Sequence, residues 1–275
     1  MSEGLLSTAD GFRAGYRDTL LDIERVSREV GDDQWDVPTG CPGWAVRDLF
    51  AHVADLESIL SGRPRGDHTI DAEPPHVRNP AGHFMEIGVD MRRARPIDDV
   101  LAELRELIPL RLATLDAITD ADLDGDVPGF LGTSKLRNQL TIRIFDLWSH
   151  DQDARRALHR PGDCDGPAAA HSRELMLRGA ARRIHDLHAP AAGTSVLVEI
   201  TGPGAARRGL VFDGDRGRAV TEAPERPDVS LRMDLSTLTV LACGRADDPD
   251  ARDRVDISGD RELGARMLTD IASTP

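Results

Sequence analysis

The stretch LTIRIFDLWSHDQDARRAL, residues 140–158, decides the fold predicted for this chain. It contains neither Gly nor Pro, and its large apolar residues recur at helical spacing, so we predict a helix. Because positions three and four apart share one face of a helix, Asp146, His150 and Asp153 form a polar stripe among apolar neighbours. A carboxylate and an imidazole are costly to bury without partners. The side chains of the stripe therefore either form ion pairs with one another or bind a ligand.

Further segments with helical periodicity predict a helical N-terminal domain. They cover residues 3–30, 45–60, 97–119 and 166–188. Together with the first stretch they predict a bundle of four antiparallel helices plus one extra helix, with a kink expected at Pro109. Residues 63–84 and 120–134 are rich in turn formers and predict loops. The first of these loops is expected to cover a pocket, because structureless segments of that length are uncommon without a role.

After residue 190 the pattern becomes that of an α+β domain. Three segments alternate apolar and polar residues as strands do, and DGDRG (213–217) predicts a hairpin turn. Two later segments have helical periodicity and begin at Asp234 and Asp260, which are expected to cap them. We therefore predict a helical bundle over residues 1–190 and a smaller α+β domain over residues 191–275. The expected strands cover residues 195–200, 209–213 and 228–233.

Composition excludes several classes of function. A chain of 275 residues suits two domains, and an apolar content of 40% supports a buried core. The formal net charge of −14 argues against nucleic acid as a partner, because phosphate binding depends on Lys and Arg. No stretch approaches the roughly 18 continuous apolar residues of a membrane span, and the N-terminus lacks a signal-peptide pattern. A cytoplasmic protein without a membrane partner is expected.

The three cysteines exclude a disulfide framework and a cysteine-rich zinc site. Cys41, Cys164 and Cys243 lie far apart and show no CxxC spacing. Cys41, within TGCPGW, is either a reactive thiol or a small residue in a turn, and we favour the turn.

Asp146 and His150 also have the i, i+4 spacing that lets two helix residues bind one ion. His52 lies in an apolar stretch of the predicted helix 45–60, and bundles commonly build metal sites from inward residues of facing helices. Two imidazoles and one carboxylate suit zinc with an open fourth position. Alternatively, Asp146 and His150 are an ordinary helix ion pair and His52 is a partly buried histidine. Spacing alone leaves both interpretations open.

Longer segments resemble a known family. CPGWAVRDLFAHVADLE (41–57) and RIFDLWSHDQDARRALHRPGD (143–163) resemble the two signatures of the mycothiol-dependent maleylpyruvate isomerase N-terminal domain, a branch of the DinB/YfiT-like metalloenzymes. DVSLRMDLSTLTVLACGR (228–245) and VDISGDRELGARML (255–268) resemble the α+β domain that follows the bundle in this family. The resemblance spans nearly the whole chain. It implies a DinB-like bundle followed by an α+β domain of the maleylpyruvate isomerase type.

The resemblance implies a divalent metal, usually zinc, held by His52, Asp146 and His150. Family members often carry Glu at the position of Asp146, and many carry Ser or Thr as a helix cap at the position of Ala45. Asp153 also fits the family pattern, and it either orients a ligand imidazole or pairs with Arg156. Asp48 is best explained as an acid at the start of its helix.

The resemblance also implies mycothiol, the low-molecular-weight thiol of actinobacteria, as cosubstrate. Two neutral imidazoles and one carboxylate leave a zinc site with a net charge of +1, which favours a thiolate as fourth ligand. Sulfur attack on a small electrophile would then give cis–trans isomerisation or S-transfer, between which the sequence does not choose. A dicarboxylate substrate would need cationic anchors, and the candidates are Arg143, Arg207, Arg208, Arg232 and Arg245. A monomer or homodimer is expected.

Two other classes of function remain open at this point. The same site could serve a metal-dependent hydrolase with water as nucleophile, and a thiol requirement would separate the two enzymes. The bundle could also be a non-catalytic module that binds a metal or small ligand. The complete set of ligand residues argues against loss of activity, and the intact α+β domain argues the same way by analogy.

Overall fold

The structure is a computed structural model that describes residues 4–71, 73–129 and 132–274. The chain forms two compact units that divide between Gly162 and Asp163. Among the helices described, none combines the length and the apolar character needed to span a membrane.

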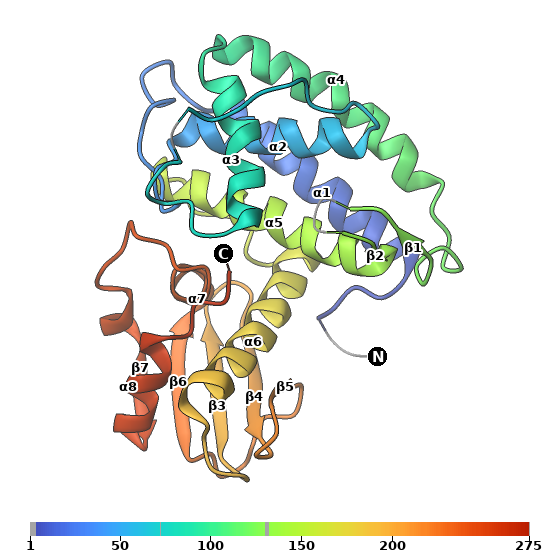
Figure 1. Ribbon diagram of the computed structural model, residues 1–275. Helices are drawn as coiled ribbons and strands as arrows, with labels where there is room; N and C mark the ends of the chain where they lie inside the picture. The colour runs from blue at the N-terminus through green and yellow to red at the C-terminus, as the bar shows by residue number, and fades with distance from the viewer. Residues whose placement is uncertain (1–3, 72, 130–131, 275) are drawn as a thin grey trace. The chain divides into compact units, whose positions relative to one another are not determined.

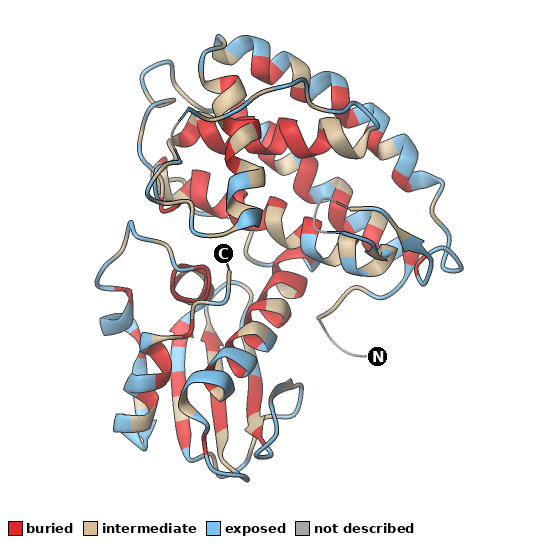
Figure 2. Cartoon of the chain, in the orientation of Figure 1, coloured by how far each residue is buried: buried red, intermediate tan, exposed pale blue. Residues whose placement is uncertain are grey.

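The first unit is a bundle of five helices within the described residues (Figure 1). Helix α1 packs against α4 and α5, whereas α2 packs against α3, α4 and α5. Large apolar side chains of these helices are fully buried, among them Phe12, Leu49, Phe50 and Trp148. Figure 2 shows buried positions along the helices of the bundle. The helices are α1 (Ala9–Ser27), α2 (Val46–Leu60), α3 (Pro80–Arg93), α4 (Ile97–Asp116) and α5 (Leu136–Ala157).

Helix α3 was not predicted from the sequence, which indicated loop through residue 84. Its start carries a standard signal, because the Asn79 side chain accepts a hydrogen bond from the Gly82 amide at 2.9 Å and Pro80 occupies the first turn. The Pro, Gly and His residues in and before its first turn favour a loop, and this hid the helix. Pro109 lies inside α4, which continues as one helix from Ile97 to Asp116.

The predicted loop at 120–134 contains a short antiparallel pair, β1 (Asp126–Val127) and β2 (Ser134–Lys135). Residues 130–131 of that loop lie outside the described residues. At the start of α2, Ala45 provides no side-chain cap. Instead the Asp48 carboxylate accepts a hydrogen bond from the Ala45 amide at 2.9 Å, which confirms Asp48 as a helix-start acid.

The second unit is an α+β fold around a five-stranded sheet of order β5-β4-β3-β6-β7. The central pair β3–β6 is parallel and the other pairs are antiparallel. Helix α6 packs against β4 and β5, and α8 packs against β6 and β7 (Figure 1). The elements are α6 (Pro167–His188), β3 (Ser195–Thr201), β4 (Ala206–Phe212), β5 (Gly217–Val220), β6 (Val229–Asp234), α7 (Leu235–Ala242), the 3-10 helix η1 (Ala251–Arg254), β7 (Asp256–Gly259) and α8 (Arg261–Thr269).

The predicted fold class, a helical bundle followed by a smaller α+β domain, is confirmed. The helix caps at Asp234 and Asp260 and the turn between β4 and β5 are confirmed as well. The division between the units lies earlier than the boundary expected near residue 190. Helix α6 belongs to the second unit because its apolar side packs on the sheet, and α3 takes the place of the extra helix in the bundle. Strands β5 and β7 were not predicted, since each has only four residues.

A buried ion network ties the bundle helices together. The Glu57 carboxylate on α2, fully buried, accepts hydrogen bonds from Tyr16, from Arg111 at 3.0 Å and from Arg143 at 2.8 Å. Burial and the Glu57 charge raise the pKa of Tyr16 to about 12, so its hydroxyl remains a donor. Because these partners come from α1, α4 and α5, one carboxylate connects four helices.

We expect Glu57→Gln to destabilise the bundle by about 3–5 kcal/mol, because it leaves two buried guanidinium groups without their shared counter-charge. Chemical denaturation followed by tryptophan fluorescence measures this loss, since Trp35, Trp44 and Trp148 all lie in the first unit. Glu106→Gln is the matched control, because Glu106 pairs with Arg63 at the surface. That variant should change stability by less than about 1 kcal/mol. Equal effects of the two substitutions would contradict a structural role for the network.

Candidate metal centre

The three candidate ligands named from the sequence, His52, Asp146 and His150, lie close together in the bundle. His52 projects from α2, and the other two project from α5, which packs against it. The His52 Nε2 atom lies 3.2 Å from Asp146 Oδ2, and His150 Nε2 lies 3.4 Å from Asp146 Oδ1. Each residue offers one ligand atom within 4.8 Å of the others. The i, i+4 spacing on α5 and the α2–α5 contact together produce this convergence.

The donor set fits a divalent cation. Two imidazole nitrogens and a carboxylate oxygen are the ligand types that zinc prefers, and both imidazoles are buried. The His52 Nδ1 atom is buried with no hydrogen-bond partner in the part of the chain that the structure describes. Its Nε2 atom is therefore the polar contact of the ring, and it points to Asp146.

The surroundings shift the pKa values of these three groups in different directions. Burial lowers the pKa of His52, which favours the neutral imidazole that a metal requires. Burial acts against ionisation of Asp146, but the neighbouring His52 and Arg143 outweigh it and hold the pKa of Asp146 well below its usual range. Burial also opposes protonation of His150, yet its hydrogen bonds to Asp146 and Asp153 raise the pKa of His150 well above its usual range.

Arg143 anchors the carboxylate of this group. Its guanidinium binds Glu57 on one side and Asp146 on the other, and the side chain is only 3% exposed. Arg143 was a candidate anchor for a dicarboxylate substrate, but its donors are committed to these two acids. The other candidates, Arg207, Arg208, Arg232 and Arg245, belong to the second unit.

Trp44 forms one wall of the group. Its ring centroid lies 5.2 Å from that of His52 and 5.7 Å from that of His150. The indole N–H donates to Glu86 on α3 at 2.8 Å, and the same oxygen contacts His76 Nε2 at 3.0 Å. The loop before α3 therefore reaches this wall through His76. Sequence reasoning missed Glu86 because helix α3 itself was missed.

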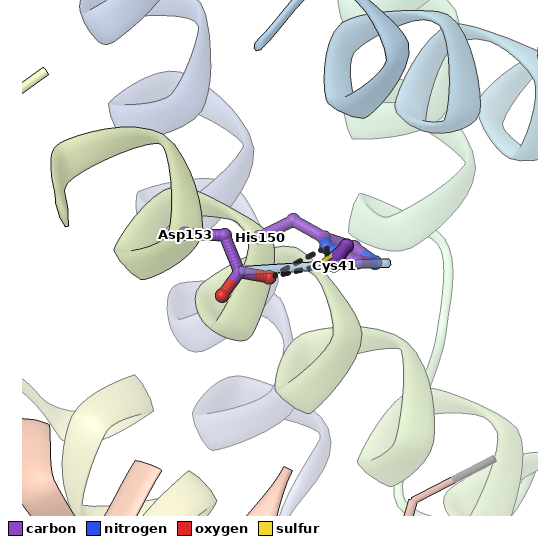
Figure 3. A group of neighbouring side chains, drawn as sticks. All are labelled: Cys41, His150 and Asp153. Carbon is purple, nitrogen blue, oxygen red and sulfur yellow. Dashed lines mark hydrogen bonds and ion pairs between the residues drawn. The ribbon is translucent and has the colours of Figure 1, made fainter. Parts of the chain in front are cut away.

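Asp153 lies behind His150 and is fully buried (Figure 3). Its Oδ2 atom is 3.1 Å from His150 Nδ1, and its Oδ1 atom accepts a hydrogen bond from Arg156 at 2.6 Å. Asp153 therefore contacts both of the groups considered for it from the sequence, the His150 imidazole and Arg156. Cys41 sits in a turn, as favoured, and its thiol contacts Asp153 Oδ2 at 3.0 Å.

With this geometry in view, comparison with known proteins identifies the family. The model of the mycothiol maleylpyruvate isomerase N-terminal domain matches residues 17–155. The chain belongs to this family. The model of the SCP-2 sterol transfer family matches residues 174–269, which lie in the second unit. The resemblance stated from the sequence, to an enzyme family of the maleylpyruvate isomerase type, is thereby confirmed.

Two solved structures and one curated protein are also similar to this chain. Crystal structures of the mycothiol-dependent maleylpyruvate isomerase and of a histidine-to-alanine mutant of it each superpose with a TM-score of 0.56. The aligned region covers 91% of this chain and 92% of the other at 14% identity, so the likeness is one of fold. A predicted metal-dependent hydrolase of Bacillus licheniformis is 29% identical over 133 residues, which cover 46% of this chain and 72% of that protein.

We expect the two histidines to titrate on opposite sides of the usual value of 6.5 in metal-free protein, His150 above it and His52 below it. Histidine NMR on EDTA-treated protein measures both pKa values. Asp153→Asn should lower the pKa of His150, because it removes an anionic acceptor. An unshifted His150 would contradict the hydrogen-bonded geometry.

The same shift has a consequence for stability. A histidine whose pKa is raised by folding stabilises the protein fully below its unfolded pKa of about 6.5, and this contribution is lost as the pH rises through the folded pKa. The contribution of His150 to the metal-free protein therefore falls above neutral pH.

Proposed function

We propose that this chain is a metal-dependent enzyme that uses mycothiol as a thiol cosubstrate against a small electrophile. One observation carries the proposal: His52, Asp146 and His150 present three ligand atoms of the types that zinc prefers, at one point between two packed helices. Membership in the mycothiol maleylpyruvate isomerase family supports the thiol and an isomerase activity. The name of the Bacillus licheniformis relative supports a metal.

In this proposal His52, Asp146 and His150 hold a divalent cation, with zinc as our choice. A zinc ion with one open position would lower the pKa of a bound thiol, so that the thiol reacts as a thiolate. Arg143 holds the Asp146 carboxylate toward the histidines. Trp44 packs on both imidazoles and limits the access of water to that side.

In the proposed reaction, bonds form and break only in the thiol and its electrophile. Addition of the thiolate to an electrophilic carbon of a double bond converts that bond to a single bond, about which the adduct can rotate. Expulsion of the thiolate then regenerates the double bond in the other geometry, which is cis–trans isomerisation. Protonation of the adduct instead would leave a thioether, which is S-transfer. We propose isomerisation first, because the family model supports it.

We expect the wild-type protein to contain about one zinc per chain. His52→Ala and His150→Ala should each lose it, because two protein ligands would remain. Elemental analysis after zinc incubation and desalting measures the content. His83→Ala is the matched control, since His83 lies at the surface and pairs with Glu73 at 3.3 Å. Wild-type protein without stoichiometric metal would refute the metal centre.

Metal binding should also release a proton. The raised pKa of His150 means that a bound cation must displace its proton near neutral pH, so affinity should rise by up to about tenfold per pH unit below that pKa. Calorimetry in two buffers of different ionisation enthalpy counts the protons released. Affinity independent of pH between about 6 and 7 would contradict the displacement of a proton from His150 on metal binding.

A metal-dependent hydrolase is the second candidate, and the name of the Bacillus licheniformis relative is the observation that favours it. We expect zinc-loaded protein to turn over cis-configured unsaturated dicarbonyl acids only when mycothiol is added. Ultraviolet absorbance follows the double bond, and ester hydrolysis is measured in parallel without thiol. Turnover of esters without thiol, together with no isomerisation in its presence, would favour the hydrolase.

A further inference from the structure

Cys41 is a buried thiol that the proposed chemistry leaves without a role. It is 7% exposed and lies beside His150 and Asp153 (Figure 3). Its Sγ atom is 3.0 Å from Asp153 Oδ2, the same oxygen that lies 3.1 Å from His150 Nδ1. One carboxylate oxygen therefore faces both a thiol and the imidazole of a proposed ligand.

The charges decide which groups donate. Arg156 donates to the other oxygen of Asp153 at 2.6 Å, and this guanidinium favours the ionised carboxylate. An ionised carboxylate only accepts hydrogen bonds. The Cys41 S–H and the His150 Nδ1–H are then both donors to Oδ2. A thiolate 3.0 Å from that oxygen would instead bring two negative charges together.

The hydrogen bond at Nδ1 determines what Nε2 can do. A neutral imidazole carries one N–H, and when that hydrogen is on Nδ1 the lone pair is on Nε2. The Nε2 atom of His150 is the one that faces Asp146, at 3.4 Å. Fixing Asp153 therefore fixes both the tautomer and the ring orientation that a cation at this site needs.

The turn that carries Cys41 is itself well anchored. The Cys41 amide donates to Thr39 Oγ1 at 3.2 Å, and the Trp44 amide donates to the Cys41 carbonyl at 3.0 Å. Gly43 has φ +79°, and a Cβ atom there would lie 2.2 Å from the His76 ring, so this turn requires glycine. One rigid turn thus places Cys41 behind Asp153 and Trp44 on the ring of His150.

We propose that Cys41 is a positioning residue of the metal centre: its thiol holds Asp153, which in turn holds His150 with Nε2 toward the other two ligands. This inference rests on the proposed function, because it assumes that the site binds a metal. In this inference the Cys41 thiol is a hydrogen-bond donor. It is neither a nucleophile nor a metal ligand. Among the residues that the structure describes, none is a hydrogen-bond partner of His52 Nδ1, so the positioning acts on one of the two imidazoles.

The test measures zinc affinity by competition with a chromophoric chelator, using the full-length protein. Cys41→Ala should weaken zinc binding about tenfold, at the low end of the roughly 10- to 100-fold effect of residues that orient metal ligands. Cys41→Ser should recover most of the loss, because a hydroxyl can donate to Asp153 in the same place. Cys243→Ala is the matched control, since Cys243 is also a buried thiol but belongs to the second unit.

A second measurement separates positioning from ligation. Cys41, His150 and Asp153 also form a group whose ligand atoms could hold a metal. Cobalt(II) loading without added thiol therefore serves as an optical probe. We expect a spectrum without a sulfur-to-cobalt charge-transfer band, unchanged in this respect by Cys41→Ser. Such a band in the wild type, lost in Cys41→Ser, would make Cys41 a ligand and overturn the proposal.

The zinc measurements separate failure of the positioning role from failure of the metal centre. Wild-type protein that binds zinc, with Cys41→Ala equal to Cys243→Ala, would overturn the positioning role and leave the metal centre standing. Loss of zinc in Cys41→Ala with no recovery in Cys41→Ser would also overturn it, because packing and not the hydrogen bond would then be responsible. Wild-type protein that binds neither zinc nor cobalt would remove the metal centre and this inference together.

Discussion

The ion pair between Glu57 and Arg143 is the interaction on which the rest of the site depends. It joins α2 to α5, the two helices that carry the three proposed ligands, and it is almost completely removed from water. A buried charge without its partner is strongly destabilising, so the two helices are held in one register. Because Arg143 also binds Asp146, the same pair that fixes the helices fixes the carboxylate between the two histidines.

The two imidazoles are held by different physical means. His52 is held by packing against Trp44 and by the contact of its Nε2 atom with Asp146, and its Nδ1 atom has no hydrogen bond among the described residues. His150 is held by a hydrogen-bonded carboxylate that has partners of its own. In metal-free protein this difference separates their pKa values in opposite directions. A cation would therefore meet one imidazole that is already neutral and one that must release a proton.

The resemblance to the family leads us to expect Glu at the position of Asp146, and this chain has the shorter acid. The shorter side chain reaches less far from α5, and in this structure Arg143 binds it from one turn before on the same helix. Its oxygens nevertheless lie within 3.4 Å of the Nε2 atoms of both histidines. The ligand class is unchanged by the shorter acid.

The sequence by itself determined the helices that carry His52, Asp146 and His150, the fold class and the family, because each follows from local spacing, caps and continuous motifs. Only the tertiary structure decided the boundary at residue 162, the commitment of Arg143 to two acids and the contact of Cys41 with Asp153. The last two depend on side chains about 85 to 110 residues apart meeting in space. No local pattern records such a meeting, since burial and charge pairing are settled only when the helices pack.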